Sequence, residues 1–474
     1  MGKEAGTKKA HKLLIGRIDN RGVGALLFVL IFGSLAVTII VTGVASYGIF
    51  EHRVSVRQHR RDLSFHIAEA GINYYRWHLA HAPTDYEDGT GLPGPYRHSF
   101  EDKDGNTIGY FSLAIQPPLS GTSVVIVSST GWTVWEPEMT RTIQVRMGFP
   151  ALSDYTFLTN ANMAFSFTSQ VNGSVHSNGG IRFDGENDSW VKSARDRYEY
   201  LPNQWRNGVW GGGGPRSFWQ YPVPAIDFFS ITTDLDALDD LSREPEGAHL
   251  TSSGNEGWHI VFEGSTYDLY RVTSRDCYNG QGRWRRRFGG WYWDGSVYCY
   301  DIGNETLVTS NNPLPENGAI FVEDDVWVEG EIDGRVSVGV GRFPPIEPYP
   351  RIYLAGDITY RVRSSDDVLG ILSQGDVIYP HDVPDTMTID AAMLSQFGSI
   401  HRPFYDSHTR DSLTVFGSQI YYTSGGVKYV NGFGNVISGF VDTNYLYDAN
   451  LRYFPPPGIP VENTYELISW EELE

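Results

Sequence analysis

The longest apolar run in the chain covers residues 23–50 and contains no charged side chain. A helix over these 28 residues would measure about 42 Å, which exceeds the roughly 30 Å hydrocarbon core of a bilayer. A removable secretory signal has an apolar region of only about 7 to 15 residues. The pattern therefore predicts a membrane-inserted helix, and the alternative is a buried helix of a large soluble core.

Apolar side chains continue past this run at helical spacing. They recur at alternating steps of four and three residues, which places them along one side of a helix. These residues are Leu63, Ile67, Ala70, Tyr74 and Trp77. No proline occurs before Pro83. The pattern predicts one helix over residues 22–82, half in lipid and half projecting, with a side that needs a packing partner.

Short alternating segments follow the predicted helix. Three strand-like runs cover residues 108–116, 123–129 and 141–147, separated by turn-forming sequences. In the last run, Ile143 and Val145 alternate with polar residues, which is the period-two pattern of a half-buried strand. We expect residues 83–150 to form a small antiparallel β meander.

The pattern changes again over residues 151–460, which are rich in Gly, Asn, Asp and aromatic residues. Short β runs recur around glycines 19 positions apart, at Gly356 and Gly375 and again at Gly398 and Gly417. Near-constant spacing of this kind is typical of a parallel β-solenoid, and a β-sandwich is the alternative. The predicted fold is thus α+β followed by a mainly β region.

Three segments of this region differ from the rest. Residues 225–241 have partial helical spacing, and residues 254–300 resemble an inserted hairpin because they are rich in Gly and aromatic residues. Residues 461–474 follow a proline-rich stretch and are expected to be a C-terminal tail.

Charge is distributed unevenly along the chain, whose net charge is −20. Residues 1–61 carry ten Lys or Arg against three acids, and the rest carries 27 against 54. A body this acidic is a poor nucleic-acid partner, whereas the basic part flanks the apolar run, where anionic lipid would lie. Six of the basic residues precede the run, so residues 1–21 are expected to be a cytoplasmic stub. We expect a single-pass protein of a bacterial cytoplasmic membrane, with its ectodomain outside.

The chain has two cysteines, Cys277 and Cys299, within the predicted insertion. In an oxidising compartment they could form one disulfide that closes a loop. The alternative is two unpaired buried thiols.

The N-terminal region contains Arg21-Gly22, then the long aliphatic run, and later the sequence AEAGI at residues 68–72. With these features it resembles PilX-type pilus assembly proteins, which are related to type IV pilins and minor pseudopilins. This resemblance covers about 60 residues well. It implies a pilin-like processing site among Gly22, Val23, Gly24 and Ala25. The later segment VHSNGGIRFDG and the ending YDANLRYFPPPGIP also resemble long proteins of this type.

This sequence lacks one residue that major pilins carry, which is a Glu at the fifth position of the mature chain. That position is Leu27 or Val29 here, depending on the cleavage site. In the family this Glu is thought to pair with a neighbouring subunit's terminal amine, a pairing that lipid makes important. The departure favours an accessory, initiating or tip subunit, or a plain anchor, over a repeating filament subunit.

Catalytic signatures are absent from the sequence, which contains no GxSxG, HExxH or GxxxxGK[ST] motif. The acidic pairs at 324–325 and 366–367 could mimic a polysaccharide-cleaving β-helix, but adjacent strand residues face opposite ways. The loop 184–189 has enough oxygens for a loose calcium site but lacks EF-hand spacing. We therefore expect no enzyme activity, no cofactor and no metal.

The most unusual surface candidate is the aromatic and basic group in the predicted insertion. Trp284, Trp291, Trp293 and Arg285 could contact glycan or protein by stacking and cation–π interactions. The alternative is that these aromatics pack the insertion onto the domain. The sequence thus predicts a structural or assembly component of a type IV pilus-like or type II secretion-like system, with its subunits as partners. The second hypothesis is a surface adhesin.

Overall fold

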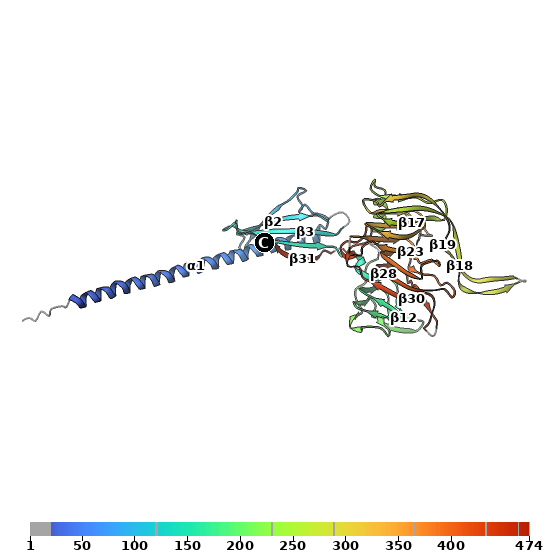
Figure 1. Cartoon of the computed structure of the whole chain (residues 1–474), viewed down its shortest axis with the longest axis horizontal. Helices are drawn as coiled ribbons and strands as arrows, with labels where there is room; N and C mark the ends of the chain where they lie inside the picture. Colours follow the sequence, from blue (N-terminus) through green and yellow to red (C-terminus); the bar gives the residue numbers. More distant parts are fainter. Residues whose placement is uncertain are drawn as a thin grey trace, which may run out of the picture.

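The computed structural model describes residues 20–118, 122–228, 231–287, 290–364, 366–431, 434–462 and 464–473. A long bare helix forms one end of the molecule, a small sheet packs on the far part of that helix, and a large β-rich domain forms the other end (Figure 1). The predicted basic stub, residues 1–21, lies outside the described residues except for its last two positions.

Helix α1 (Asn20–His81) is continuous over 62 residues, about 93 Å at 1.5 Å per residue. It ends just before Ala82, because the residue preceding a proline disfavours helical backbone. Every side chain from Gly24 to Phe50 is exposed to solvent. The prediction of a long N-terminal apolar helix is confirmed.

The second half of α1 packs on a five-stranded antiparallel sheet, and the two together form the small domain. The strands lie in the order β1-β2-β3-β4-β31. Their bounds are β1 (Tyr96–Glu101), β2 (Thr107–Gln116), β3 (Val124–Thr133), β4 (Arg141–Gly148) and β31 (Glu466–Leu473). In β4, Ile143, Val145 and Met147 are buried in the core under the helix, on the side that their alternation predicts.

The buried side of α1 is displaced by about one residue from the predicted one. The residues buried against the sheet are Ser64, Ile67, Ala68, Gly71, Ile72, Tyr75 and Leu79. Trp77, which was predicted to be on this side, is 60% exposed. The prediction followed the large apolar side chains, whereas the small residues Ser64, Ala68 and Gly71 are the ones that let the helix approach the sheet closely.

Two glycines show how close this approach is. A Cβ atom on Gly131 of β3 would lie 2.4 Å from the backbone N of Ala68 and 2.4 Å from the carbonyl O of Ser64. A Cβ on Gly71 would lie 2.2 Å from Ser129 Oγ and 2.8 Å from the Phe111 ring. Both positions therefore require glycine for steric reasons, since a methyl group has no room.

Residues 461–474, expected to be a tail, contribute the fifth strand of the small sheet. Strand β31 pairs antiparallel with β4, from Glu466 opposite Gly148 to Leu473 opposite Thr142. Just before it, Tyr465 is buried, stacks 3.8 Å from the Phe149 ring and donates a hydrogen bond to the carbonyl of Pro83 at 2.9 Å. The C-terminal residues thus complete the sheet that the N-terminal helix covers.

The large domain is inserted between β4 and β31, and the chain enters and leaves it side by side. The amide of Ala151 donates to the carbonyl of Arg452, and the amide of Leu152 to that of Pro460, each at 2.8 Å. The amide of Glu462 donates to the carbonyl of Pro150, also at 2.8 Å. Two hydrogen-bonded connectors join the domains, which restricts their relative motion more than a single linker would.

The large domain is mostly β, as predicted. Its strands are β5 (Tyr155–Thr159), β6 (Met163–Phe165), β7 (Ser169–Val171), β8 (Ser174–Ser177), β9 (Ile181–Phe183), β10 (Glu186–Asn187), β11 (Val191–Ser193), β12 (Arg197–Leu201), β13 (Gln204–Asn207), β14 (Val209–Trp210), β15 (Trp219–Gln220), β16 (Ala248–Leu250), β17 (Gly257–Gly264), β18 (Thr266–Arg287), β19 (Gly290–Pro313), β20 (Ala319–Val322), β21 (Val326–Ile332), β22 (Arg335–Val340), β23 (Ile352–Tyr360), β24 (Val368–Ser373), β25 (Val377–Ile378), β26 (Thr386–Ser395), β27 (Ile400–His401), β28 (Thr409–Tyr421), β29 (Lys428–Val430) and β30 (Val436–Leu446). Its helices are η1 (Leu152–Asp154), η2 (Arg216–Phe218), α2 (Ile231–Ser242) and η3 (Ala449–Arg452).

A ladder of parallel pairs runs through this domain. Strands β20, β22, β24, β26 and β28 pair in that order, each parallel to the next. Paired residues in this series are separated by 18, 33, 22 and 26 positions, as for Ile320 with Val338 and Val336 with Leu369. The 19-residue glycine spacing seen in the sequence is therefore not the repeat of the ladder, because the connections differ in length.

The order of strands in space is not their order in the chain. Strand β28 also pairs parallel with β5, the first strand of the domain, through Ile420 and Leu158. Strand β5 pairs with β8, and β8 with β11. The first part of the domain thus extends the ladder at one end, and the chain then crosses to the other end near β16. The inward aliphatic side chains of all these strands share one continuous core.

Helix α2, predicted over residues 225–241, covers one side of this ladder. Leu235 and Leu238 are buried against Phe321 and Leu372 in a second cluster.

A long antiparallel hairpin, β18 with β19, is the insertion predicted over residues 254–300. It covers residues 266–313, pairs from Thr266 with Pro313 to Arg287 with Gly290, and projects from the end of the molecule opposite α1 (Figure 1). The alternation of polar and aromatic residues in the hairpin did not allow its full length to be predicted from the sequence.

Candidate functional site

The exposed half of α1 is the first functional feature. The helix is long and apolar enough to cross a membrane, by length and composition. Three of its hydroxyl groups bond to the helix backbone: Ser34 Oγ donates to the carbonyl of Ile31 at 3.0 Å, Thr38 Oγ1 to that of Ser34 at 2.8 Å, and Thr42 Oγ1 to that of Thr38 at 2.7 Å. Polar groups satisfied in this way can enter lipid without an unpaired donor.

The residues predicted as a processing site lie in the first turns of this helix. Gly22, Val23, Gly24 and Ala25 all have helical backbone, and Gly24 and Ala25 are exposed. The side chains of Gly22 and Val23 lie outside the described set. Processing at this position stays a prediction.

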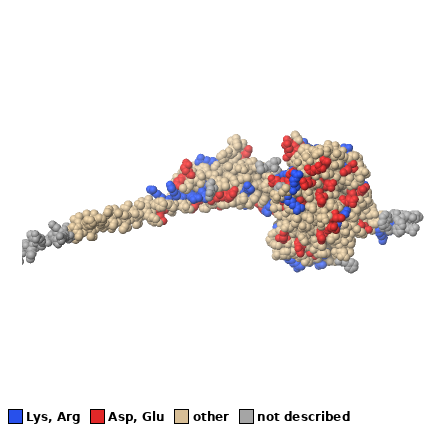
Figure 2. Space-filling model, viewed as in Figure 1, with Lys and Arg blue, Asp and Glu red and all other residues tan. Residues whose placement is uncertain are grey.

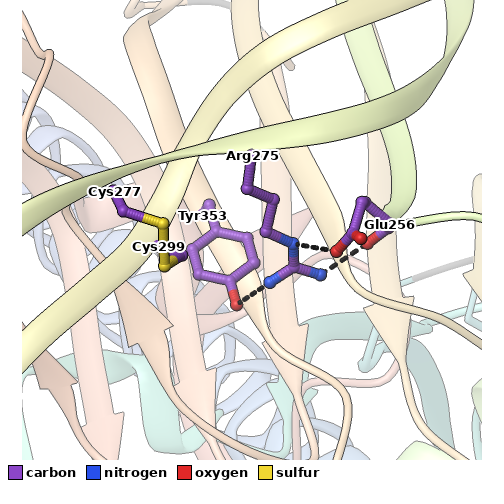
Figure 3. Close-up of a disulfide and its surroundings, with 5 residues drawn as sticks. All are labelled: Glu256, Arg275, Cys277, Cys299 and Tyr353. Carbon is purple, nitrogen blue, oxygen red and sulfur yellow. Dashed lines mark hydrogen bonds and ion pairs between the residues drawn. A yellow bond between two sulfur atoms is a disulfide. The ribbon is translucent and has the colours of Figure 1, made fainter.

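The base of the β18–β19 hairpin is the second feature. Cys277 and Cys299 form a disulfide that joins the two strands of the hairpin, beside the buried ring of Tyr353 (Figure 3). Arg275 lies between Tyr353 and Glu256 in the same view. Its Nη1 donates to Tyr353 Oη at 3.0 Å, and its Nε lies 2.9 Å from Glu256 Oε2.

Arg275 also pairs with Asp325, at 2.9 Å from Nη2 to Oδ2, and its guanidinium lies over the Trp327 ring at 4.9 Å. Tyr353 donates to the same carboxylate oxygen at 3.1 Å. One cation thus joins the hairpin to β21 and β23 through charged hydrogen bonds and ring contacts, at a site where its side chain is 18% exposed. Arg275 is therefore one of the polar contacts between the hairpin and the ladder.

Replacing Arg275 with methionine should destabilise the large domain by about 2–4 kcal/mol, because it leaves the Asp325 carboxylate without its partner. Methionine keeps much of the packing on Trp327, so the loss reports the polar contacts. Chemical denaturation of both proteins measures the effect. Arg283→Met, at an exposed position near the hairpin tip, is the matched control and should change stability little. Equal stability of the two variants would contradict this role.

Asp301 makes a second contact between the hairpin and the ladder. This buried carboxylate of β19 accepts hydrogen bonds from the amide of Asp382 at 2.6 Å and from that of His381 at 3.1 Å. Burial raises the pKa of Asp301 to about 6, although the two amides oppose the shift. Its ordinary pKa is about 3.9.

The pH dependence of Asp301 follows from this raised pKa. Below pH 4 the Asp301 carboxyl is protonated in both the folded and the unfolded protein. Between pH 4 and 6 only the folded protein keeps this proton. The contribution of Asp301 is therefore greatest below pH 4 and is lost as pH rises to about 6. We expect the stability of the wild type relative to Asp301→Asn to fall by about 2–3 kcal/mol over this range. Urea unfolding at several pH values tests this, and a constant difference would contradict it.

Three tyrosines pack the hairpin on the ladder, and the sequence analysis did not single them out. The Tyr278 ring stacks 3.7 Å from His381, Tyr298 lies 5.8 Å from Tyr405, and Tyr300 lies 5.4 Å from Tyr353. The period-two spacing of Tyr298 and Tyr300 was the available signal, since such residues lie on one side of a strand.

The predicted ligand residues lie at the tip of the hairpin. Trp284 pairs across it with Trp293, and Trp291 with Arg286. Arg285 forms an ion pair with Asp294, and Trp293 Nε1 donates to the carbonyl of Ser296 at 2.9 Å. The side chains of Trp284 and Trp291 lie outside the described set. The role of these four residues in ligand contact stays a prediction.

The acidic groups considered for chemistry hold neighbouring backbone in place. Asp184 Oδ1 accepts from the Gly212 amide at 2.8 Å, and Asp188 Oδ1 from the Gly173 amide at 2.9 Å. Asp324 accepts from the Ser253 amide at 2.8 Å, and Asp367 from the Gly334 amide at 2.9 Å. Within the described ranges, no group of three or more His, Cys, Asp or Glu is placed to hold a metal ion.

Three solved chains match this chain by structure, and one of them is described below. No protein-family model matches the sequence, and no curated protein matches it. The crystal structure of the competence-associated pilin ComZ from Thermus thermophilus aligns with a TM-score of 0.30 and 13% identity, covering 87% of this chain and 98% of that one. A TM-score this low carries no argument about the fold, and PilX-type proteins in particular receive no support from the comparisons.

Proposed function

We propose that this chain is a membrane-anchored structural or assembly component of a type IV pilus-like or type II secretion-like envelope system. One observation carries the proposal: the same helix α1 is an exposed apolar span in its first half and the packed spine of an antiparallel sheet in its second. A soluble protein would have to expose about 27 residues of apolar helix to water, at a large free-energy cost. The proposal assigns no catalytic role to the chain.

The charge distribution supports an orientation with the N-terminus inside. Six basic residues precede the apolar run, and the long domain that follows would cross the membrane largely regardless of its charge. Figure 2 shows Asp and Glu side chains spread over the large domain. The disulfide agrees with an oxidising compartment.

The size of the large domain supports an accessory or tip position. It is inserted in the small sheet and lies at the far end of the molecule from α1 (Figure 1). In a filament of stacked copies, each such domain would need lateral space beyond the small domain. The missing Glu at the fifth position points the same way.

We further propose that residues 151–460 are a parallel β-solenoid. The ladders of parallel pairs and the single inward-facing aliphatic core support this fold over a sandwich, whose sheets are commonly antiparallel. The irregular separation of paired residues is compatible with coils that carry loops of different length.

Fractionation of sheared surface filaments tests the assembly role. We expect the wild type in the membrane and, in small amounts, with filament or secretion subunits to which it can be cross-linked. Ile39→Arg/Ile40→Arg places two charges in the span, each costing about 2.5–3.5 kcal/mol at the centre of a bilayer, and should be lost from both fractions. Ile39→Leu/Ile40→Leu is the control. If the wild type stays in the membrane and is cross-linked to no filament or secretion subunit, the chain acts only as an anchor. That result would contradict the assembly role.

The position of the hairpin favours a second candidate, a surface adhesin. The hairpin projects from the end of the molecule opposite α1 (Figure 1), and the disulfide and Arg275 hold its base. Replacing residues 283–294 with Asn-Gly would join Gly282 to Gly295, which are paired across the hairpin, and keep the disulfide. This variant should fold normally and lose binding to glycan or cells. Unchanged binding would reject the adhesin.

A further inference from the structure

Four arginines gather on one side of α1 where its apolar half ends. Arg53, Arg57, Arg60 and Arg61 fall within about 100° of the helix circumference at 100° per residue, whereas Glu51 and Asp62 fall on the opposite side. Figure 2 shows this group of basic side chains at the point where the bare helix meets the small domain. In this part of the helix one side is therefore basic and the opposite side is acidic. The basic residues follow directly after the apolar run.

Three of these arginines have no ion-pair partner in the part of the chain that the structure describes. Arg60 Nη1 donates to Glu136 Oε1 at 2.6 Å. Among the described residues, Arg53, Arg57 and Arg61 make no ion pair, and all three are exposed. Two of the nearby acids are already bonded: Glu136 holds Arg60, and Glu51 accepts from Tyr47 at 2.9 Å, whereas Glu138 lines a separate hollow with Arg61.

A surface hollow of about 610 Å³ accompanies the arginines, between the helix and the β3–β4 connection. Its lining is basic on one part and apolar on another, and includes Phe50, Arg53, Val54, Arg57, Arg60 and Glu136. In the same connection, next to Glu136, Trp135 is 55% exposed and Val134 is 37% exposed. An exposed tryptophan beside arginines is typical of the membrane–water interface.

The level of these groups along the helix matches that of phosphates. Arg53 and Arg57 lie about 5 and 10 Å beyond Phe50 along the axis, and the headgroup layer adds about 5–7 Å to each side of the hydrocarbon core. Because the apolar run is longer than the core, the helix can slide or tilt until this end sits at the interface. The arginine side chains can then reach the phosphates while Phe50 and Val54 contact acyl chains.

We propose that this hollow binds the phosphate headgroup of an anionic phospholipid and seats the small domain on the membrane surface. The proposal rests on the membrane anchoring proposed above. Arg53 and Arg57 line the hollow and supply the charge, because guanidinium groups bind phosphate oxygens in a fork geometry. Arg60 stays with Glu136 and holds the β3–β4 connection over the hollow. Trp135 on that connection lies at the interface.

Native mass spectrometry of the full chain from nanodiscs tests the proposal. The discs contain phosphatidylcholine with phosphatidylglycerol as the anionic probe. We expect wild type to retain phosphatidylglycerol preferentially, and the preference to fall about fivefold for each arginine changed to glutamine at positions 53 and 57. Arg76→Gln, an exposed arginine higher on the same helix, is the matched control and should keep the preference.

The outcomes separate the two proposals. A chain that does not insert in either lipid would refute the anchoring itself. A chain that inserts but retains both lipids equally would overturn the headgroup site alone. Displacement of bound phosphatidylglycerol by inorganic phosphate, or arginine-dependent oligomers in place of bound lipid, would also overturn it. All these variants change exposed side chains, and circular dichroism confirms that each remains folded.

Discussion

Gly131→Val should unfold the small domain under conditions in which the wild type is folded. A Cβ at this position would lie 2.4 Å from backbone atoms of Ala68 and Ser64, so the added methyl groups must push α1 away from β3. Overpacking of a core commonly costs 1–3 kcal/mol, and because the clash here is with backbone we expect about 3 kcal/mol or more. Limited proteolysis and urea unfolding of the full chain measure the loss.

Gly426→Val provides the control for this experiment. Gly426 lies in the large domain, is exposed, and has no atom within 4 Å of the position that a Cβ would take. It should therefore unfold like the wild type. If Gly131→Val also does so, the close approach of helix and sheet is not what stabilises the small domain.

Removing β31 should have an effect of similar size. A chain that ends at Glu462 lacks the buried ring of Tyr465, and the loss of a buried aromatic side chain costs about 3–5 kcal/mol. It also lacks the Trp470 contact with Phe65, whose rings lie 5.8 Å apart, and the ion pair between Arg141 and Glu472. Hydrogen exchange should rise in β4, which becomes an unprotected edge strand prone to association.

The large domain is the internal control for this truncation. Its ladder and the connector pairs up to Pro460 remain in the shortened chain. We expect its exchange rates and its disulfide to be unchanged. Protection that is retained in β4, or lost throughout the large domain, would show that β31 does not act on the small sheet as described.

Local pattern was sufficient to predict α1 and the strands β2, β3 and β4 of the small domain, but not β1 or β31. The uninterrupted apolar run predicted α1, and the alternation of Ile143, Val145 and Met147 predicted both β4 and its buried side. The predicted buried side of α1 is displaced by about one residue from the observed one. The reason is that Ser64 and Gly71 are buried because they are small, and they add nothing to the hydrophobic pattern. Close packing between backbones is a property of two segments together, so one segment's pattern does not reveal it.

Long-range pairing explains what the sequence did not predict. Strand β31 is mostly exposed, and its partner β4 lies more than 300 positions earlier in the chain. The contacts of Arg275 with Asp325 and of Asp301 with the backbone at His381 also join segments far apart. The tip tryptophans were conspicuous by composition, whereas the residues that hold the hairpin base are ordinary arginine, aspartate and tyrosine.

Protease treatment of intact spheroplasts tests the central claim most directly, which is that α1 spans the membrane with the ectodomain outside. The account predicts that external protease removes the domains beyond α1 and leaves an N-terminal fragment that sediments with membranes after alkaline washing. Recovery of the full-length chain in the soluble cytosolic fraction, or protection of the ectodomain until the cells are lysed, would contradict it.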